Sequence, residues 1–270
     1  MDTNKFCSIE QFRHLRRNVE WRAQYTGNDA NGDPIMDRLA KMPTLKLRGT
    51  EKLHGSNCSV RFFKNGDIVC QSRERIITPE DDNYGFARFI SELPQDIIQQ
   101  LTIEAGCDEI IYYGERAGKG IQNKVAISEV EKFWAVFAVK TVINGVENWI
   151  DLYEFGNSIW DWDALGQYRI FNIYNGKTWE IDVDFESPGD AINQMNAWTL
   201  EVEKESPFGL KLGVSGIGEG IVYQVVTLGY EGSKFWYKNK GEAHAGSRVT
   251  KLANVDVVKM KSIEEFIEAH

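Results

Sequence analysis

The sequence lacks any stretch that approaches the roughly 20 consecutive apolar residues of a membrane-spanning helix. Residues 1–5 also lack a basic segment followed by an apolar run, which is the pattern of a secretory leader. The absence of both patterns predicts a soluble, intracellular protein with a cytoplasmic location and no membrane partner.

Cysteine and histidine are scarce and scattered. None of the four cysteines forms a C-x-x-C pair, and the four histidines do not cluster. This spacing argues against a disulfide framework and a zinc site and predicts reduced, structural thiols. The residues are Cys7, Cys58, Cys70, Cys107, His14, His54, His244 and His270.

The sequence also lacks an excess of basic residues, and its formal net charge is −9. Taken alone, this value disfavours a general binder of phosphate backbones. The acidity, however, is confined to the middle of the chain. Residues 1–125 hold 18 basic and 18 acidic side chains, residues 126–230 hold 6 and 16, and residues 231–270 hold 7 and 6. The first and last segments are therefore compatible with local positive surfaces.

The composition is that of a globular protein with a sizeable core. Hydrophobic residues make up 42% of the 270 residues, and aromatic residues make up 12%, including eight Trp. We predict one domain over residues 1–245 and a short tail over residues 246–270, in which Ser262 and Glu265 form a capping box for a helix.

Periodicity and turn signals predict an α+β fold of antiparallel sheets flanked by helices. Asn65-Gly66 joins two predicted strands in a hairpin, and Asn144-Gly145 turns a third strand back on itself. The predicted strands are residues 45–51, 58–63, 67–72, 109–115, 133–141, 220–226 and 234–240. The predicted helices are the N-terminal stretch to Trp21, residues 84–101 with a break at Pro94, and a segment opened by Ser187-Pro188 that runs through Glu205.

Regular βαβ alternation, a Walker phosphate loop and a G-x-G-x-x-G turn are all absent. A nucleotide site in this chain must therefore be built from side chains. One candidate begins with Lys52 and Gly55, a K-x-x-G pattern that chance alone would supply roughly once or twice in such a chain.

The surroundings of Lys52 make the pattern more specific. Five short motifs occur in order, each next to a predicted strand. They are Glu51-Lys52-Leu53-His54-Gly55-Ser56-Asn57, Ser72-Arg73, Tyr113-Gly114-Glu115, Glu219-Gly220-Ile221-Val222 and Lys238-Asn239-Lys240.

With these motifs the sequence resembles the covalent nucleotidyltransferases, and within them the nick-sealing RNA ligase 2 family of phage and kinetoplastid RNA-editing enzymes. The likeness covers about residues 45–240. The stretch from Tyr113 to Gln122, which ends in Gly118-Lys119-Gly120-Ile121-Gln122, points to this family rather than to DNA ligases or capping enzymes. The resemblance implies an ATP-grasp-like ligase adenylylation domain for residues 1–245. Phage members of the family carry an additional C-terminal domain that helps engage RNA, and we predict that residues 246–270 do not form a full domain of that kind.

The resemblance implies that Lys52 is the nucleophile that forms a lysyl-AMP intermediate with ATP. A lysine nucleophile needs a depressed pKa, which nearby cations and a divalent metal supply. Lys238 and Lys240, at i and i+2 of a strand, share one face and match the pair that holds the α-phosphate. Glu219 matches the carboxylate that positions Mg²⁺ or Mn²⁺.

The remaining matches concern the nucleotide and the RNA end. Glu115 and Arg73 match the ribose contacts, and Arg73 also reaches toward the phosphate end. Glu51 matches a contact to the adenine amino edge, and Asn57 a polar contact to the nucleotide or RNA end. Phe137 is the candidate for stacking on adenine, although the chain has Ala138 where the family usually has aspartate.

The leading prediction is an ATP-dependent RNA ligase that transfers AMP to an RNA 5′-phosphate and joins that end to a 3′-hydroxyl. Its partner would be nicked or bridged RNA, in a host cytoplasm if the protein is phage-encoded, and a protein partner would compensate for a missing RNA-binding domain. The alternatives are a DNA ligase or capping-type nucleotidyltransferase, and a catalytically silent nucleic-acid-binding relative. His54 and Cys58 are assigned structural roles.

Overall fold

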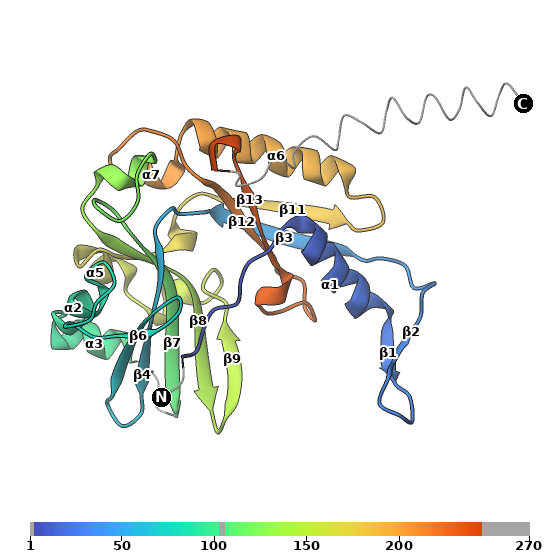
Figure 1. Cartoon of the computed structure of the whole chain (residues 1–270), viewed down its shortest axis with the longest axis horizontal. Coiled ribbons are helices and arrows are strands. Elements are labelled where there is room, and N and C mark those ends of the chain that lie inside the picture. Colours follow the sequence, from blue (N-terminus) through green and yellow to red (C-terminus); the bar gives the residue numbers. More distant parts are fainter. Residues whose placement is uncertain (1–2, 103–105, 245–270) are drawn as a thin grey trace, which may run out of the picture.

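The computed structural model describes residues 3–102 and 106–244. The predicted final helix around Ser262 lies outside these residues. Two sheets dominate the described part, with helices on their outer sides and a small hairpin that projects from the body (Figure 1). This architecture confirms the predicted α+β class.

The large sheet has the strand order β10-β8-β7-β4-β5-β6, with β9 paired to β8, and all its pairs are antiparallel except β10 with β8. The bounds are β4 Ser56–Phe63, β5 Ile68–Ser72, β6 Ile76–Ile77, β7 Glu109–Ala117, β8 Phe133–Ile143, β9 Val146–Ile150 and β10 Ile170–Asn172.

The small sheet has the order β11-β3-β12-β13 and is antiparallel throughout. Its bounds are β3 Thr44–Glu51, β11 Thr178–Asp184, β12 Gly220–Val225 and β13 Trp236–Lys240. The projecting hairpin consists of β1 Tyr25–Asn28 and β2 Pro34–Met36.

Seven α-helices and four short 3-10 helices complete the described part of the chain. The α-helices are α1 Phe12–Gln24, α2 Phe86–Ser91, α3 Gln95–Leu101, α4 Gly156–Ile159, α5 Trp162–Gln167, α6 Gly189–Lys204 and α7 Pro207–Lys211. The 3-10 helices are η1 Ala126–Glu129, η2 Ile173–Asn175, η3 Ser233–Phe235 and η4 Glu242–His244.

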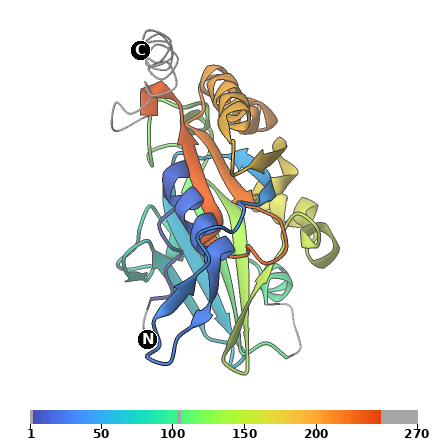
Figure 2. The same ribbon diagram turned by 90° about the vertical axis from the view of Figure 1, so that its right-hand side faces the viewer.

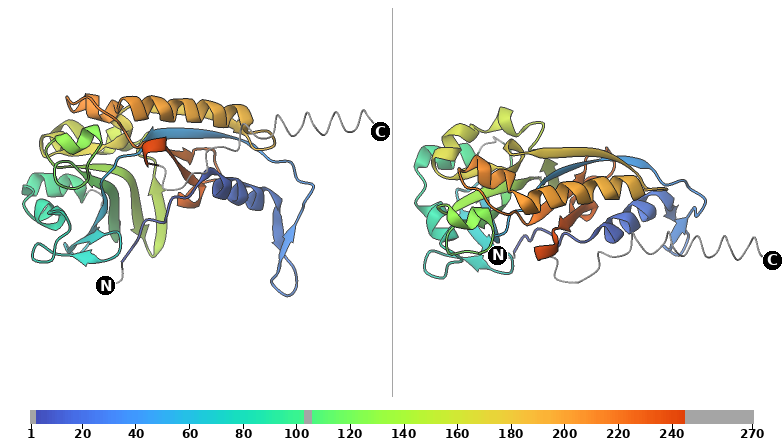
Figure 3. Two further views of the ribbon diagram at one scale, coloured as in Figure 1. Left: turned by 45° about the horizontal axis from the view of Figure 1, so that its top comes forward. Right: turned by 90° about the horizontal axis from the view of Figure 1, so that it is seen from above.

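Each sheet has its own hydrophobic core. One face of the large sheet packs against α2, α3 and α5, with Trp134, Tyr112 and Phe86 almost fully buried. The small sheet packs against α1 and α6, with Leu15, Val19 and Met195 among the buried side chains. Helix α6 runs along the small sheet on the side away from the large sheet (Figures 1 and 3). The remaining faces of the two sheets are thus left to form a site between them.

Strand β8 contains a β-bulge where the chain passes the site. Its pairing with β7 shifts register, because Tyr113 is opposite Ala138 whereas the next residue, Gly114, is opposite Val136. Phe137 is the extra residue, and a bulge re-aims side chains by breaking the alternation of a strand. Both Phe137 and Ala138 consequently line cavities between the sheets.

Residues 4–10 form an extended N-terminal strap across the same region. Asn4 is fastened to the large sheet, because its backbone N–H donates to Gln71 and its side-chain oxygen accepts from Tyr113 and Lys140. At the other end, the backbone N–H of Lys238 donates to the Glu10 carbonyl at 2.9 Å. The strap therefore connects the large sheet to the edge of the small sheet.

Several predicted boundaries need correction. The first helix begins at Phe12 rather than near the N-terminus and extends to Gln24, and the β1–β2 hairpin follows it. Helix α6 has Pro188, not Ser187, at its N-cap, without a side-chain cap. The predicted strand at residues 234–240 opens instead with η3.

No helix in residues 3–102 and 106–244 is long and apolar enough to cross a membrane.

Candidate active site

A cavity of about 400 Å³ lies between the two sheets. Residues from the ends of β3, β12 and β13 line one side, and residues of β4, β7 and β8 line the other. All nine predicted site residues lie on its wall, namely Glu51, Lys52, Asn57, Arg73, Glu115, Phe137, Glu219, Lys238 and Lys240.

Glu219 is the centre of the polar contacts on the small-sheet side. Its side chain is only 1% exposed, and Oε2 accepts a hydrogen bond from Lys52 Nζ at 2.6 Å. Oε1 lies 2.7 Å from Lys240 Nζ, and His54 Nδ1 lies 3.3 Å from Oε2. Burial of Glu219 raises its pKa, but the ammonium groups of Lys52 and Lys240 outweigh this effect and lower the pKa below its usual value. Glu219 is therefore a buried carboxylate between two lysines.

Strand register brings these three residues together. Glu51, which precedes Lys52, is paired with Ile221, and the Lys52 N–H donates to the Gly220 carbonyl at 2.8 Å. Gly220 is in turn paired with Lys240 on β13. The nucleophile candidate, the carboxylate and one phosphate-binding candidate thus sit at the same end of three adjacent strands.

A close contact with β7 explains why the fourth position of the K-x-x-G pattern, Gly55, is a glycine. A Cβ at this position would lie 2.3 Å from the Arg116 carbonyl oxygen of β7. The close approach lets the Gly55 N–H donate to Glu115 Oε1 at 3.0 Å. Burial, and to a smaller extent repulsion from Glu219, raise the pKa of Glu115 to about 7 against the opposing effect of Lys52.

The carboxylate of Glu51 is hydrogen-bonded to residues at the N-terminal end of α7. Its carboxylate accepts a hydrogen bond from Ser206 Oγ at 2.5 Å and one from the Phe208 N–H at 2.7 Å. The side chain is buried, and burial raises the pKa of Glu51 to about 7 although both hydrogen bonds oppose the shift. Ser206 was not predicted from the sequence as part of the site.

Arg73 extends from the turn after β5 to the rim of the cavity. Its guanidinium donates to Ser8 Oγ of the strap at 2.9 Å and lies 3.7 Å from Glu74. Asn57 is opposite Glu115 in the β4–β7 pair, so these two polar residues lie side by side on the large-sheet wall.

Lys238 lies on the same face of β13 as Trp236 and Lys240, since alternate residues of a strand share a face. Partial burial lowers the pKa of Lys238, and the nearby charges of Lys240 and Lys52 lower it further. This cation has no carboxylate partner among residues 3–102 and 106–244, which leaves it available for a phosphate.

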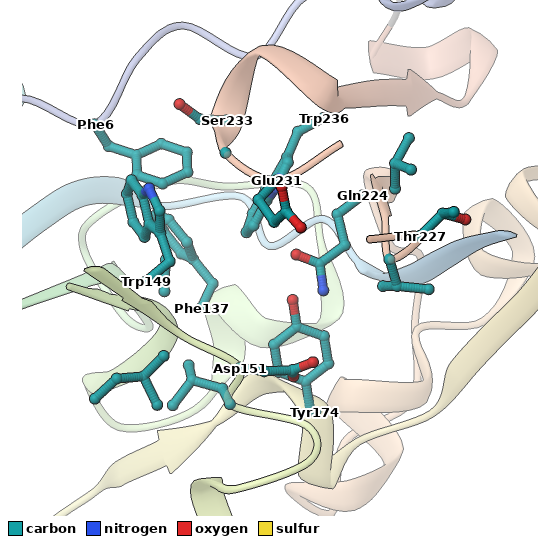
Figure 4. A pocket seen from close by; sticks show the side chains of 16 residues that line it. Phe6, Phe137, Trp149, Asp151, Tyr174, Gln224, Thr227, Glu231, Ser233 and Trp236 are labelled. Atoms are coloured by element: carbon teal, nitrogen blue, oxygen red, sulfur yellow. The ribbon is translucent and has the colours of Figure 1, made fainter. Parts of the chain in front are cut away.

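Phe137 faces an aromatic cluster formed with the strap and β13. The ring of Phe6 lies 5.1 Å from that of Phe137 and 5.3 Å from that of Trp236. The three rings line both the large cavity and a second one of about 160 Å³, and Figure 4 shows them at the second cavity. In the second cavity Asp151, Gln224 and other polar side chains converge (Figure 4).

The donor set fits a sparsely liganded divalent ion. Within the described ranges no three His, Cys, Asp or Glu residues gather as a protein cage. Magnesium prefers one or two carboxylates completed by phosphates and water, and Glu219 offers such a carboxylate at the cavity wall.

Comparison with known proteins places the chain in a family. The sequence model described as RNA ligase matches residues 46–240. This chain belongs to the RNA ligase family. No curated protein sequence gives a match.

Solved structures of an RNA ligase from Naegleria gruberi share the fold of this RNA ligase family member. The structure with PPi is 16% identical over 90% of this chain and 58% of that chain, with a TM-score of 0.53. A mutant with AMP and Mn is 16% identical over 89% of this chain and 56% of that chain, with a TM-score of 0.53. A mutant with ATP and Mn is 16% identical over 90% of this chain and 57% of that chain, with a TM-score of 0.55. This chain therefore spans less than two thirds of the length of those enzymes.

Three residues of this family member are in the site although the sequence did not assign them to it. His54 contacts Glu219, whereas a structural role was predicted for it. Phe6 and Trp236 line both cavities. His54 lies inside the K-x-x-G pattern, which is a signal that could have identified it, but Phe6 reaches the site only through the path of the strap.

Proposed function

We propose that this protein is an ATP-dependent RNA ligase that joins a 5′-phosphate end to a 3′-hydroxyl end through a lysyl-AMP intermediate on Lys52. The observation that carries the proposal is the arrangement of Lys52, Lys240 and the buried Glu219 on one wall of a nucleotide-sized cavity. Residues 1–245 would constitute the adenylyltransferase unit.

In the first step Lys52 Nζ, in its neutral form, attacks the α-phosphorus of ATP. An N–P bond forms, the bond from that phosphorus to the bridging oxygen breaks, pyrophosphate leaves, and the amine loses its proton. Lys238 and Lys240 lie where two ammonium groups would offset the negative charge on the α-phosphate.

Glu219 is the residue that would hold a divalent ion. When bound, Mg²⁺ or Mn²⁺ would supply positive charge that offsets the phosphates and disfavours the ammonium form of Lys52. In this structure Glu219 Oε2 lies 2.6 Å from Lys52 Nζ.

The large-sheet wall and the neighbouring carboxylate would position the nucleotide. Phe137 offers an aromatic face for the adenine, and Glu51 offers carboxylate oxygens to its amino group. Glu115 and Asn57 would contact the ribose or the RNA end, and Arg73 on the rim would contact the 5′-phosphate.

In the second step an oxygen of the RNA 5′-phosphate attacks the lysyl-AMP phosphorus. A P–O–P bond forms, the P–N bond to Lys52 breaks, and the lysine nitrogen takes up a proton and leaves as the amine. In the third step the 3′-hydroxyl oxygen attacks the 5′-phosphorus, AMP leaves, and the hydroxyl proton is released. Glu115, whose pKa is raised to about 7, is a candidate to accept that proton.

The proposal is tested by incubating the purified protein with α-³²P-labelled ATP and Mg²⁺. We expect a labelled protein band that is lost in Lys52→Ala and kept in Lys204→Ala, which alters an exposed lysine on another element. A wild-type protein without label, or a band that survives Lys52→Ala, would refute the proposal.

Parallel reactions separate the alternatives. Labelling by GTP instead of ATP would indicate a capping-type enzyme, and sealing of nicked DNA but not nicked RNA would indicate a DNA ligase. We expect labelling by ATP and joining of a 5′-phosphate to a 3′-hydroxyl in a nicked RNA duplex.

A further inference from the structure

Helix α1 carries a dense group of positive charge on a chain whose net charge is −9. Its 13 residues include four arginines, all exposed, and one acidic residue, Glu20. Among residues 3–102 and 106–244, none of the four arginines has a carboxylate within 4.0 Å. Some exposed cations elsewhere, such as Lys5, Arg75 and Lys177, do have one, whereas others in the described residues, such as Lys64 and Lys204, do not. The four arginines are Arg13, Arg16, Arg17 and Arg22.

Three of these arginines point away from the protein core. Leu15 and Val19 are buried against the small sheet and fix the inner side of α1. Arg13, Arg17 and Trp21 follow one another at intervals of four residues, so they lie along one side of the helix, with Arg16 beside them. We call Arg13, Arg16, Arg17 and Trp21 the arginine face.

An aromatic side chain lies at the end of this face. Trp21 is 47% exposed, and its ring stacks on that of Tyr25 with a centroid distance of 4.7 Å and an interplanar angle of 13°. An exposed tryptophan beside unpaired guanidinium groups is the combination that binds nucleic acid strands, because cations neutralise phosphates and aromatic rings stack on bases.

The start of helix α1 lies close to the cavity. Glu10, the last residue of the strap, accepts a hydrogen bond from the backbone N–H of the cavity residue Lys238, and α1 begins two residues later. The strap also contacts Arg73 at the cavity rim through Ser8. Helix α1 then runs from β13 toward the projecting hairpin (Figures 1 and 2).

The hairpin limits the surface at the far end. Its turn carries Asp29 and Asp33, which would repel phosphates. The positive surface therefore covers the length of α1, about 20 Å for 13 residues at 1.5 Å each.

We propose that the arginine face of α1 binds the phosphate backbone of the RNA substrate outside the reacting ends, independently of base sequence. The inference rests on the proposed ligase function, and it assigns the RNA-docking surface of that site. Arg13, Arg16 and Arg17 contact phosphates, and Trp21 stacks on one base.

The test is binding of a fluorescent nicked RNA duplex with single-stranded overhangs to the full chain, without ATP, over a range of salt concentrations, because Trp21 can stack only on an unpaired base. In R13Q/R16Q/R17Q we expect the slope of log Kobs against log salt to become shallower by about 2 to 3, since each phosphate contact contributes about 0.7 to 0.9. In Trp21→Ala we expect about a 5- to 150-fold loss of affinity, and Trp21→Phe should restore most of it.

Self-adenylylation separates this inference from the proposed function. None of these residues lines the cavity, so we expect labelling of Lys52 by ATP to be unchanged in R13Q/R16Q/R17Q, whereas sealing of the nick falls. Loss of labelling in the wild-type protein would refute the ligase proposal, while RNA binding would still report on α1.

The matched control is K64Q/K132Q/K204Q, which removes the same charge from exposed lysines elsewhere that also have no carboxylate within 4.0 Å in the described residues. An equal change of slope in this control, or an unchanged slope in the α1 variant, would overturn the inference. Competition by polyglutamate as effective as that by RNA would also overturn it, in favour of an acidic protein partner. Thermal unfolding of each variant must match that of the wild type. If R13Q/R16Q/R17Q unfolds at a lower temperature, R13K/R16K/R17K replaces it as the test: this variant keeps the charge, and we expect it to show the salt slope of the wild type.

Discussion

Glu219 receives Lys52 and Lys240 on separate oxygens, and His54 approaches the oxygen that Lys52 uses. A buried carboxylate whose two oxygens are both occupied by cations fixes the positions of those cations relative to each other. The separation of Lys52 from Lys240 in the cavity thus depends on one side chain.

Glu219→Gln should therefore reduce the reactivity of Lys52, the proposed nucleophile, although Lys52 itself is unchanged. We expect labelling of the protein by α-³²P-ATP to fall at least about 100-fold, because a displacement of about 1 Å in a reacting group costs that much. The control is Glu201→Gln, an exposed carboxylate near Lys177. A Glu219→Gln variant that labels at the wild-type rate would contradict the assigned role.

Glu51 makes stability depend on pH. Burial raises its pKa from an ordinary 4.5 to about 7, so between these values the folded chain holds a proton that the unfolded chain releases. The contribution of Glu51 to stability is therefore most favourable below pH 4.5 and declines as the pH rises to about 7.

Glu51→Gln should remove this part of the decline, which is at most about 3 kcal/mol. Urea unfolding at pH 5 and pH 8 measures it: the wild type should lose more stability between the two values than the variant. The pKa of Glu115 is also raised to about 7, so Glu115 makes the same contribution to the loss of stability with pH in both proteins. Identical losses in the two proteins would show that Glu51 is not the titrating group.

At the scale of elements, the K-x-x-G connection between β3 and β4 depends on close contact with β7. Gly55→Ala would place a Cβ 2.3 Å from the Arg116 carbonyl oxygen and displace the N–H that binds Glu115. We expect a loss of about 1–3 kcal/mol in the free energy of unfolding. Chemical denaturation checks it, with Gly189→Ala as control, because nothing lies within 4 Å of a Cβ there. Equal stabilities of the two variants would contradict the packing argument.

The strands of the site could be predicted from the sequence because local signals define them. Asn65-Gly66 and Asn144-Gly145 lie at the two hairpin turns where they were expected, and Pro94 separates α2 from α3. Each signal acts within a few residues, so a single sequence is enough to read it.

Other features depend on contacts between distant residues. The β-bulge at Phe137 exists only relative to the register of β7. The strap is attached through Asn4 to residues 67 to 136 positions away and through Glu10 to Lys238. Strand β11 lies in the acidic, tryptophan-rich segment, where hydrophobic periodicity gave no strand prediction. The sequence therefore predicted nine residues that the fold brings to one cavity, but not the parts of the fold that place Phe6 and Ser206 there.

At the scale of the whole molecule, the cavity is formed by two sheets with separate cores. A ligand that bridges the sheets binds only when both are folded and packed, so it stabilises the molecule as a unit. For Lys52→Ala, which cannot form the covalent bond, ATP with Mg²⁺ at 100 times its Kd should raise the free energy of unfolding by about 2.7 kcal/mol.

A thermal scan with and without nucleotide measures this stabilisation. GTP serves as the control nucleotide, and we expect a smaller shift of the unfolding midpoint with it. Equal shifts with both nucleotides would contradict the assignment of Glu51 to the adenine amino group, and the absence of any shift would contradict the nucleotide site.

The ion pair between Lys52 and Glu219 joins residues that are 167 positions apart in the chain. Since β3 must also pair with β12, and β12 with β13, the ribosome makes the lysine long before it makes the partners of that lysine. A nascent chain that stops short of β13 has a lysine but no cavity around it. We therefore expect that a newly made molecule can react with nucleotide only after synthesis has passed Lys240, which keeps truncated chains from consuming ATP.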